Sequence, residues 1–345
     1  MKKNTIAMAI IAAGMAFCAS ADLYMAGDST MCNYFRGKYP QQGWGQALGW
    51  YMKDPAKLHN YAVGGMSLKT CRMGQWQKIL EHLKPGDYVI IAFGHNDCIP
   101  AKADRYSTPE EFRAMMKMCN DEVKATGASM IIATSVPHSG GITADAEGKV
   151  HVRGGAAKIG SHVWAACEAA RELGLPCLNL NRYAEEHLPE LGDIGKVLKL
   201  YMIIEPGEYD KYPDGFCDRC HLRDRGAFWF ATAAVKMARE QKLPVCKLFK
   251  DPKDVKFVPI PKSGPTAITD ETKDNFSADE VAYAGTDEAE LQANKQWEAD
   301  AWKREIMALR KEGMAKGMDK NEAMRWAAGE LRRRQAERAA AAAAE

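Results

Sequence analysis

The sequence has little net charge and few long apolar runs. Its 345 residues include 47 Lys and Arg against 45 Asp and Glu, a formal net charge of +2. This balance argues against a nucleic-acid-binding protein, whose excess of Lys and Arg would still be visible in the net charge of the whole chain. After residue 21, no apolar run approaches the roughly 18 residues needed to span a membrane. Because 46% of the residues are hydrophobic, general disorder is excluded as well.

Several motifs of common enzyme classes are also missing. The chain has no G-x-S-x-G segment, no Walker A lysine and no H-E-x-x-H segment. The segment 43–49 (GWGQALG) has one residue too many for the G-x-G-x-x-G fingerprint of dinucleotide-binding proteins. We expect this segment to be a loop that enters a helix.

Residues 1–21 form the one long apolar segment. Lysines at positions 2 and 3 are followed by an apolar stretch and then by Ala19-Ser20-Ala21. This order is typical of a secretory signal peptide, whose removal leaves a mature protein that begins at Asp22. The alternative, an N-terminal core helix, fits the order less well. We therefore expect an exported protein, periplasmic or extracellular, with no membrane attachment after cleavage.

Ten cysteines are present, and loss of Cys18 with the signal peptide leaves nine. An oxidising compartment permits disulfides, but an odd number leaves at least one thiol free. Cys119, Cys167 and Cys246 lie in or beside apolar helical or strand patterns, where buried structural thiols are common. The sequence leaves the pairing of the remaining cysteines open: Cys32, Cys71, Cys98, Cys177, Cys217 and Cys220.

Residues 22–250 alternate between short apolar runs and longer helical periods. Strands are predicted at 23–26, 88–93 and 130–134, with weaker candidates at 59–63 and 177–180. Helices are predicted at 109–124, 156–172 and 226–241. Such alternation predicts an α/β domain with a mostly parallel sheet covered on both faces. Ligands bind at the carboxyl ends of the strands in such sheets, so the residues after each strand are the first candidates for a functional site.

The composition changes after this domain. Residues 251–285 are rich in Pro and Lys and resemble a linker, whereas 286–345 are rich in Ala, Glu, Lys and Arg, a helical composition. Trp302, Ile306 and Leu309 form an apolar helical stripe in this extension. We interpret the extension as amphipathic helices packed on their own domain. The alternative is a hairpin that docks a partner.

The first predicted strand ends in Gly27-Asp28-Ser29-Thr30. The glycine permits a tight turn, and we expect Ser29 to begin a helix, where its backbone N–H has no intrahelical partner. A serine placed there can act as a nucleophile whose own amide stabilises an oxyanion. A simple helix N-cap is the common alternative.

Two further loops carry candidate oxyanion donors. The strongest predicted strand is followed by Gly94-His95-Asn96-Asp97, where the Asn96 amide can donate to a developing negative charge. An Asx-turn is the structural alternative for Asn96 or Asp97. The segment 60–67 (NYAVGGMS) contains a glycine turn whose backbone N–H groups can point into the same crevice.

The last loop is Asp218-Arg219-Cys220-His221, which precedes a predicted helix. An Asp three residues before a His can bring its carboxylate to the imidazole Nδ1 within one turn. That contact fixes the tautomer and leaves Nε2 as a general base.

These segments, in this order, resemble the four sequence blocks of the SGNH (GDSL-type) ester hydrolases. The resemblance covers about residues 22–248. It implies a flavodoxin-like three-layer α/β/α fold without a cofactor or metal ion. It also implies that Ser29 is the nucleophile, that His221 is the base oriented by Asp218, and that acetyl transfer to Ser29 precedes hydrolysis by water. The implied oxyanion hole consists of the Ser29 and Gly65 amides and the Asn96 side chain.

Within that superfamily the chain looks most like bacterial rhamnogalacturonan acetylesterases. The features that carry this likeness are Gly43-Trp44-Gly45-Gln46, the Phe93–Asp97 block and Tyr212-Pro213-Asp214-Gly215. Trp44, His138 and Tyr212 are candidates for substrate binding, although aromatic residues are also ordinary core residues. The expected partner is an acetylated polysaccharide or oligosaccharide, most simply rhamnogalacturonan in pectin. Acetylated xylan and lipid or aryl esters are the alternatives.

One block departs from the family. Arg219-Cys220 stands where a small polar pair is expected, and Cys217 and Cys98 lie next to catalytic blocks. Either a disulfide stiffens the catalytic loop or the local chemistry differs from that of the relatives. Residues 217–221 also match C-x-x-C-H, the haem c attachment motif, and contain a C-x-x-C pair typical of redox proteins. A haem or redox protein is a remote alternative, because it leaves the other three blocks unexplained.

Overall fold

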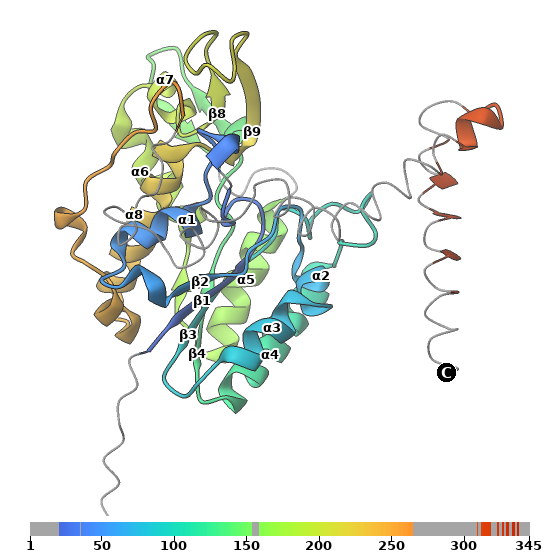
Figure 1. The fold of residues 1–345 in the computed structure, drawn as a ribbon, viewed down its shortest axis with the longest axis vertical. Helices are drawn as coiled ribbons and strands as arrows, with labels where there is room; N and C mark the ends of the chain where they lie inside the picture. Colours follow the sequence, from blue (N-terminus) through green and yellow to red (C-terminus); the bar gives the residue numbers. More distant parts are fainter. Residues whose placement is uncertain are drawn as a thin grey trace, which may run out of the picture.

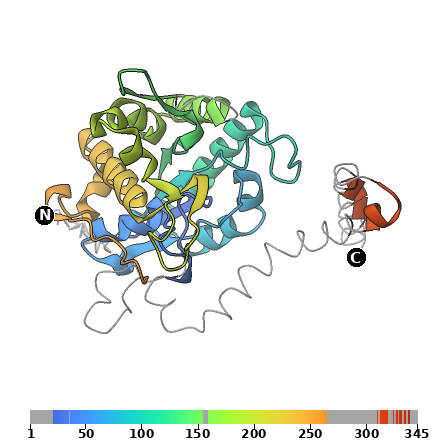
Figure 2. The same ribbon diagram turned by 90° about the horizontal axis from the view of Figure 1, so that it is seen from above.

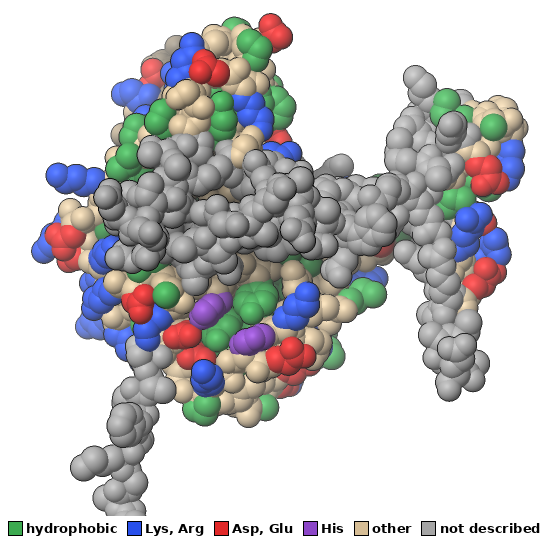
Figure 3. All heavy atoms as spheres, viewed as in Figure 1, with side chains coloured by type: hydrophobic (Ala, Val, Ile, Leu, Met, Phe, Trp, Pro, Cys, Tyr) green, Lys and Arg blue, Asp and Glu red, His purple; other side chains and the backbone are tan. Residues whose placement is uncertain are grey.

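The computed structural model describes residues 21–34, 36–153 and 159–264, together with 309, 312–318, 323, 326–327, 329–330, 333–334 and 337. The predicted signal peptide lies outside the described residues apart from Ala21, and so do most of the predicted linker and extension. Within the described ranges, no helix is long and apolar enough to cross a membrane. On the face shown in Figure 3, Lys and Arg side chains are interspersed with Asp and Glu, in keeping with the low net charge.

The centre of the molecule is a parallel sheet of five strands (Figure 1). The strands are β1 Leu23–Gly27, β2 Leu58–Asn60, β3 Tyr88–Ala92, β4 Ser129–Ala133 and β7 Cys177–Leu178. Their spatial order is β2-β1-β3-β4-β7, and each adjacent pair is parallel. This is the flavodoxin-like order. All residues of β1 and β3 are buried, which accounts for their continuous apolar sequences.

Helices cover both faces of the sheet, which gives three layers (Figures 1 and 2). Side chains alternate along β1, so that Met25 belongs to one core cluster and Tyr24 to the other. The first cluster includes residues of α1 and α8, and the second includes residues of α2, α3, α4 and α5. The predicted fold class is therefore confirmed. The helices are α1 Trp44–Leu48, α2 Leu68–Arg72, α3 Gln75–His82, α4 Pro109–Ala125, α5 Gly160–Leu173, α6 Leu180–His187, α7 Ile194–Leu198 and α8 Asp224–Glu240.

The α4 helix shows how local sequence sets an element boundary. Thr108 Oγ1 accepts the N–H of Glu111 at 3.2 Å, and the Glu111 carboxylate accepts the N–H of Thr108 at 2.8 Å. This capping box satisfies two backbone donors, and Pro109 at the first helical position has no N–H to satisfy. The helix predicted at 109–124 is thus confirmed, as are those corresponding to α5 and α8.

Two small antiparallel sheets were not predicted. One pairs β5 Ile142–Ala144 with β6 Val150–Val152, and the other pairs β8 Tyr201–Ile204 with β9 Phe216–Leu222. The segment 218–221 precedes a helix as predicted, since α8 begins at Asp224, but it belongs to strand β9 and not to a turn. The sequence of β9 (FCDRCHL) lacks the alternation that marks a strand, so its pairing with β8 depends on tertiary contacts.

Residues 251–264 lie against the 22–250 domain. The N–H of Ile260 donates to the carboxylate of Asp224 at 2.8 Å, and the ring of Phe257 packs on those of Trp50 and Phe228. The first part of the predicted linker is therefore attached to the rest of the fold by polar and aromatic contacts. In the described part of the C-terminal extension, Leu309, Trp326 and Ala327 pack together. That the extension packs on its own domain stays a prediction.

Candidate active site

The segment that contains Ser29 is a tight turn at the carboxyl end of β1. The buried Asp28 carboxylate accepts hydrogen bonds from the N–H and the hydroxyl of Thr30, both at 2.8 Å. The carbonyl of Asp28 accepts the N–H groups of Met31 and Cys32. The expectation that Ser29 begins a helix was wrong, because this single turn is not continued and the next α-helix begins at Trp44.

Ser29, His221 and Asp218 form a chain of hydrogen bonds. His221 Nε2 lies 2.9 Å from Ser29 Oγ, and His221 Nδ1 lies 2.6 Å from Asp218 Oδ2. Partial burial by itself raises the pKa of Asp218, but hydrogen bonding and charge attraction to His221 outweigh it. The pKa of Asp218 therefore lies well below its usual value, and this carboxylate stays ionised. An ionised carboxylate at Nδ1 orients the imidazole so that Nε2 faces the serine.

His221 reaches Ser29 from a wide bulge in β9. Met202 pairs with Asp218, whereas the preceding residue Tyr201 pairs with Leu222, so residues 219–221 have no partners on β8. Asp218 Oδ1 accepts the backbone N–H groups of Cys220 (2.8 Å) and His221 (3.1 Å). The same carboxylate therefore shapes the bulge and holds the imidazole.

The three donors predicted for an oxyanion hole are the Ser29 and Gly65 amides and the Asn96 side chain. Among the described residues, the backbone N–H groups of Ser29 and Gly65 make no hydrogen bond. One N–H of the Asn96 amide donates to the carbonyl of Met66 at 3.0 Å, and the other has no such partner in the described structure. Gly65 has φ of +78°, which favours glycine, and a Cβ at Gly64 would lie 3.9 Å from that of Ser29. These residues are the ones predicted for an oxyanion hole.

Asp97 joins the two loops that carry those donors. Its buried carboxylate accepts the N–H of Leu68 at 2.8 Å and that of Gly94 at 3.0 Å. Burial raises the pKa of Asp97 to about 8 despite these two hydrogen bonds. Asp97 is therefore a structural residue that fixes the 64–68 turn relative to the end of β3.

Three neighbouring residues were not predicted from the sequence. The hydroxyl of Tyr34 donates to the carbonyl of Ser29 at 2.7 Å, and that of Ser139 donates to the carbonyl of Arg219 at 3.0 Å. The buried Arg105 guanidinium lies directly against Gly65. Tyr34 follows Ser29 by only five positions, so its short distance along the chain could have suggested this contact. The other two come from distant segments without a motif.

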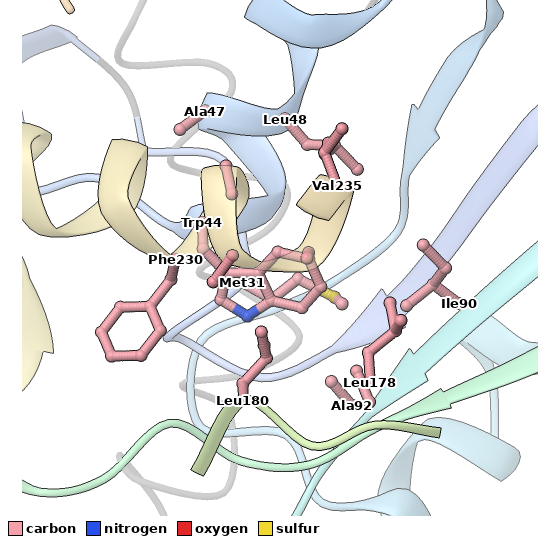
Figure 4. Packing of buried hydrophobic residues seen from close by; sticks show 14 of the residues in the cluster. Met31, Trp44, Ala47, Leu48, Ile90, Ala92, Leu178, Leu180, Phe230 and Val235 are labelled. Carbon is pink, nitrogen blue, oxygen red and sulfur yellow. The ribbon is translucent and has the colours of Figure 1, made fainter. Parts of the chain in front are cut away.

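The predicted substrate-binding residues have different environments. The prediction for Trp44 was wrong, because its side chain is only 1% exposed and lies in the core among Met31, Leu180 and Phe230 (Figure 4). Tyr212 is half-buried, with its ring 5.0 Å from that of Phe216.

His138 is exposed on the rim of the site. Burial of part of its ring and the positive charges of Arg219 and His221 lower its pKa, whereas Asp218 raises it. The next residue, Ser139, donates to the carbonyl of Arg219, so His138 lies next to the segment that carries Asp218 and His221.

All nine cysteines of the described residues are free thiols. Cys119 is buried as expected, whereas Cys167 and Cys246 are half-buried. Cys217 is exposed, and Cys220 Sγ lies 3.8 Å from His95 Nδ1. Both ring nitrogens of His221 are engaged by Ser29 and Asp218, which disfavours a haem ligand at this position. Among the described residues, no group of three or more His, Cys, Asp or Glu side chains is placed to hold a metal ion.

Comparison with known families gives a match to the GDSL-like lipase/acylhydrolase family over residues 23–231. The chain belongs to this family. As a GDSL-like hydrolase, it is a carboxylic ester hydrolase. The rhamnogalacturonan acetylesterase RhgT of Bacillus subtilis is 30% identical over 228 residues, which cover 65% of this chain and 91% of that relative.

Two further proteins of Bacillus subtilis are similar to this GDSL-like hydrolase. The probable rhamnogalacturonan acetylesterase YesY is 28% identical over 65% of this chain and 94% of the relative. The crystal structure of YxiM has a TM-score of 0.54 and 28% identity, covering 65% of this chain and 57% of that one. These matches leave residues 251–345 largely unaccounted for, and the division of the chain at residue 250 stays a prediction.

Proposed function

We propose that the protein is an exported serine esterase that releases acetate from rhamnogalacturonan. The observation that carries the proposal is the hydrogen-bonded chain from Ser29 Oγ through His221 to Asp218. In this proposal Ser29 is the nucleophile, His221 is the general base and then the general acid, and Asp218 orients and stabilises the imidazolium.

In the first step, Ser29 Oγ attacks the acetyl carbonyl carbon while its proton moves to His221 Nε2. The carbonyl oxygen becomes an oxyanion that accepts hydrogen bonds from the Ser29 and Gly65 amides and from Asn96 Nδ2. His221 then donates its proton to the sugar oxygen, the C–O bond breaks, and the sugar hydroxyl leaves an acetyl-Ser29 ester.

In the second step, water replaces the sugar. His221 Nε2 takes a proton from the water as its oxygen attacks the acetyl-serine carbonyl, and the same three donors stabilise the second oxyanion. Collapse of this intermediate returns the proton to Ser29 Oγ and releases acetate. No group other than water is consumed.

The choice of substrate is supported by the relatives. Two of them have rhamnogalacturonan acetylesterase in their names and are matched over more than nine-tenths of their own length. The similarity spans both ends of the site, from Ser29 at the end of β1 to His221 in β9.

Export is supported by the environment of the expected mature N-terminus. The backbone nitrogen of Asp22 donates to the carboxylate of Asp87 at 2.8 Å, and Asp87 is only 4% exposed. Cleavage after Ala21 would convert this amide to an ammonium group at a carboxylate, which strengthens the hydrogen bond. A processing site at this position is therefore compatible with the fold.

The test is acetate release from acetylated rhamnogalacturonan and acetylated xylan, measured side by side with the wild type and Ser29→Ala. We expect Ser29-dependent release from the pectic substrate at the higher kcat/KM. Release only from xylan would overturn the substrate. Hydrolysis of a small aryl acetate without release from either glycan would also overturn it while retaining the serine mechanism.

A further inference from the structure

The residues between Asp218 and His221 are held rigidly at the edge of the active site. They form the unpaired bulge of β9, and the Ser139 hydroxyl donates to the carbonyl of Arg219 at 3.0 Å. Since Asp218 accepts the backbone N–H groups of Cys220 and His221, the Arg219 backbone is fixed on both sides. The Arg219 side chain therefore starts from a defined point two residues from the catalytic base.

The guanidinium of Arg219 is available to a ligand. Its side chain is exposed, and among the described residues it makes no hydrogen bond or ion pair. Asp218 is the acidic neighbour in sequence, but both of its oxygens are engaged, one by His221 and one by backbone N–H groups. In contrast, Arg72 and Arg223 are paired with glutamates.

A second donor, His138, lies on the same rim. The N–H of Gly140 donates to His138 Nδ1 at 3.1 Å, so the neutral ring carries its proton on Nε2. The loop that holds this ring is anchored on β8, because the Tyr201 hydroxyl donates to the Pro137 carbonyl at 2.9 Å. Arg219 lies next to this loop, because the hydroxyl of Ser139, the residue after His138, donates to the Arg219 carbonyl.

We propose that Arg219 and His138 form a carboxylate-binding subsite for a uronate residue of the substrate next to the acetylated hydroxyl. The guanidinium presents two parallel N–H donors that match a carboxylate, and His138 Nε2 adds a third. This inference rests on the proposed function and narrows it, because a galacturonate-containing glycan carries the required carboxylate and a neutral acetylated xylan backbone does not.

The subsite predicts how the enzyme distinguishes acidic from neutralised glycan. The probes are acetylated rhamnogalacturonan oligosaccharides and the same oligosaccharides after conversion of their carboxylates to methyl esters. We expect the wild type to have a KM about fivefold lower for the acidic form, the effect of a partly exposed charge-assisted hydrogen bond. We expect kcat to be similar for the two forms, since the carboxylate takes no part in the bond changes at the acetyl carbonyl.

Substitutions of Arg219 and His138 test whether these two residues bind the carboxylate. Arg219→Ala is expected to remove most of the KM difference between the two forms, Arg219→Lys to retain part of it, and His138→Ala to reduce it. Arg182→Ala is the matched control, because Arg182 is an exposed arginine on α6 paired with Glu186, and it should retain the full preference. In the wild type, added salt should raise KM for the acidic form only.

Two results would overturn the subsite. One is an Arg219→Ala enzyme whose kinetic constants and preference for the acidic form equal those of the wild type. The other is an Arg219→Ala enzyme whose kcat/KM falls by the same factor on the acidic and the methyl-esterified forms. In either case acetate release by the wild type would leave the proposed function standing. Absence of acetate release from both forms by the wild type would instead overturn the proposed function and the subsite with it.

Discussion

The Nε2 atom of His221 lies 2.9 Å from the Oγ atom of Ser29, although 192 positions separate the two residues in the chain. Ser29 is placed by the turn that follows strand β1, and His221 by the bulge of an antiparallel strand outside the main sheet. The contact therefore depends on how β9 is positioned relative to the parallel sheet. A change that disturbs the packing of the domain would also disturb the contact between His221 and Ser29.

Ser29→Ala should lower kcat by at least about 10⁴-fold, since no other group can form the acetyl intermediate. The fold should be retained, because the turn is held by Asp28, Thr30 and the Ser29 backbone rather than by the Ser29 side chain. Aryl acetate hydrolysis and thermal unfolding measured on the same preparation test both parts. Turnover close to that of the wild type would refute Ser29 as the nucleophile.

Asp218→Asn should lower kcat by about 10⁴-fold, because the amide no longer favours the tautomer that leaves Nε2 as an acceptor. The substitution also tests a pH dependence of stability. The folded-state pKa of Asp218 lies below the unfolded value of about 3.9, so its stabilising contribution is present above that pH and is lost as the pH falls through the folded value.

The wild type should therefore exceed Asp218→Asn in free energy of unfolding at pH 7, and the difference should shrink below about pH 4. Urea unfolding of both proteins at pH 7 and pH 3 measures this. A difference that does not depend on pH would show that the charge of Asp218 does not stabilise the fold.

The parallel sheet was predictable because each of its main strands is continuous and apolar. β3, for example, is YVIIA, and its neighbours β1 and β4 are of the same kind. The residues after these strands were predictable candidates too, because carboxyl ends of parallel strands meet at one edge. That rule alone selects Ser29 and Asn96 as candidate site residues.

The antiparallel additions were not predictable in the same way. His221 was recognised from its three-residue spacing to Asp218 in the sequence. The strand that carries it was not predicted, because residues 219–221 bulge out of the ladder and break the two-residue period. Trp44 illustrates the opposite problem. An aromatic residue close to a motif suggests ligand stacking, yet its indole fills the core beneath α8, and only burial distinguishes the two roles.

Asn96→Ala should lower kcat by about 10²–10³-fold through loss of one oxyanion donor, with a smaller effect on KM. The substitution also removes the hydrogen bond to the Met66 carbonyl, so the glycine turn loses one of its supports. Stopped-flow or steady-state kinetics with an aryl acetate gives the split between kcat and KM. A rise in KM with unchanged kcat would indicate that Asn96 acts only on the turn.

Glu122 joins three helices and provides a test of stability away from the active site. Its carboxylate accepts two hydrogen bonds from Arg72 on α2, at 2.7 and 2.9 Å, and one from the buried indole N–H of Trp76 on α3, at 2.6 Å. Glu122→Ala leaves the Trp76 indole N–H without an acceptor and the Arg72 guanidinium without its carboxylate partner, and it should destabilise the fold by about 2–3 kcal/mol.

Glu122→Gln keeps an acceptor for Trp76 and should cost less, on the order of 1 kcal/mol. Ester hydrolysis at 25 °C should be preserved in both variants, because α4 does not contribute to the site. Equal stability of the Ala variant and the wild type in urea unfolding would show that this network adds nothing to the fold.

The predicted N-terminus gives the last test. In a protein that begins at Asp22, the new ammonium group faces the carboxylate of Asp87, whereas in a protein that retains Ser20 and Ala21 the same nitrogen is a neutral amide. Asp87→Asn should therefore lower Tm more in the shorter protein, by about 2–4 °C, because an ion pair between ammonium and carboxylate is lost only there. The longer protein is the matched control, since the hydrogen bond from Lys84 N–H to Asp87 is common to both. Equal losses of Tm in the two forms would show that no terminal ion pair stabilises the shorter protein.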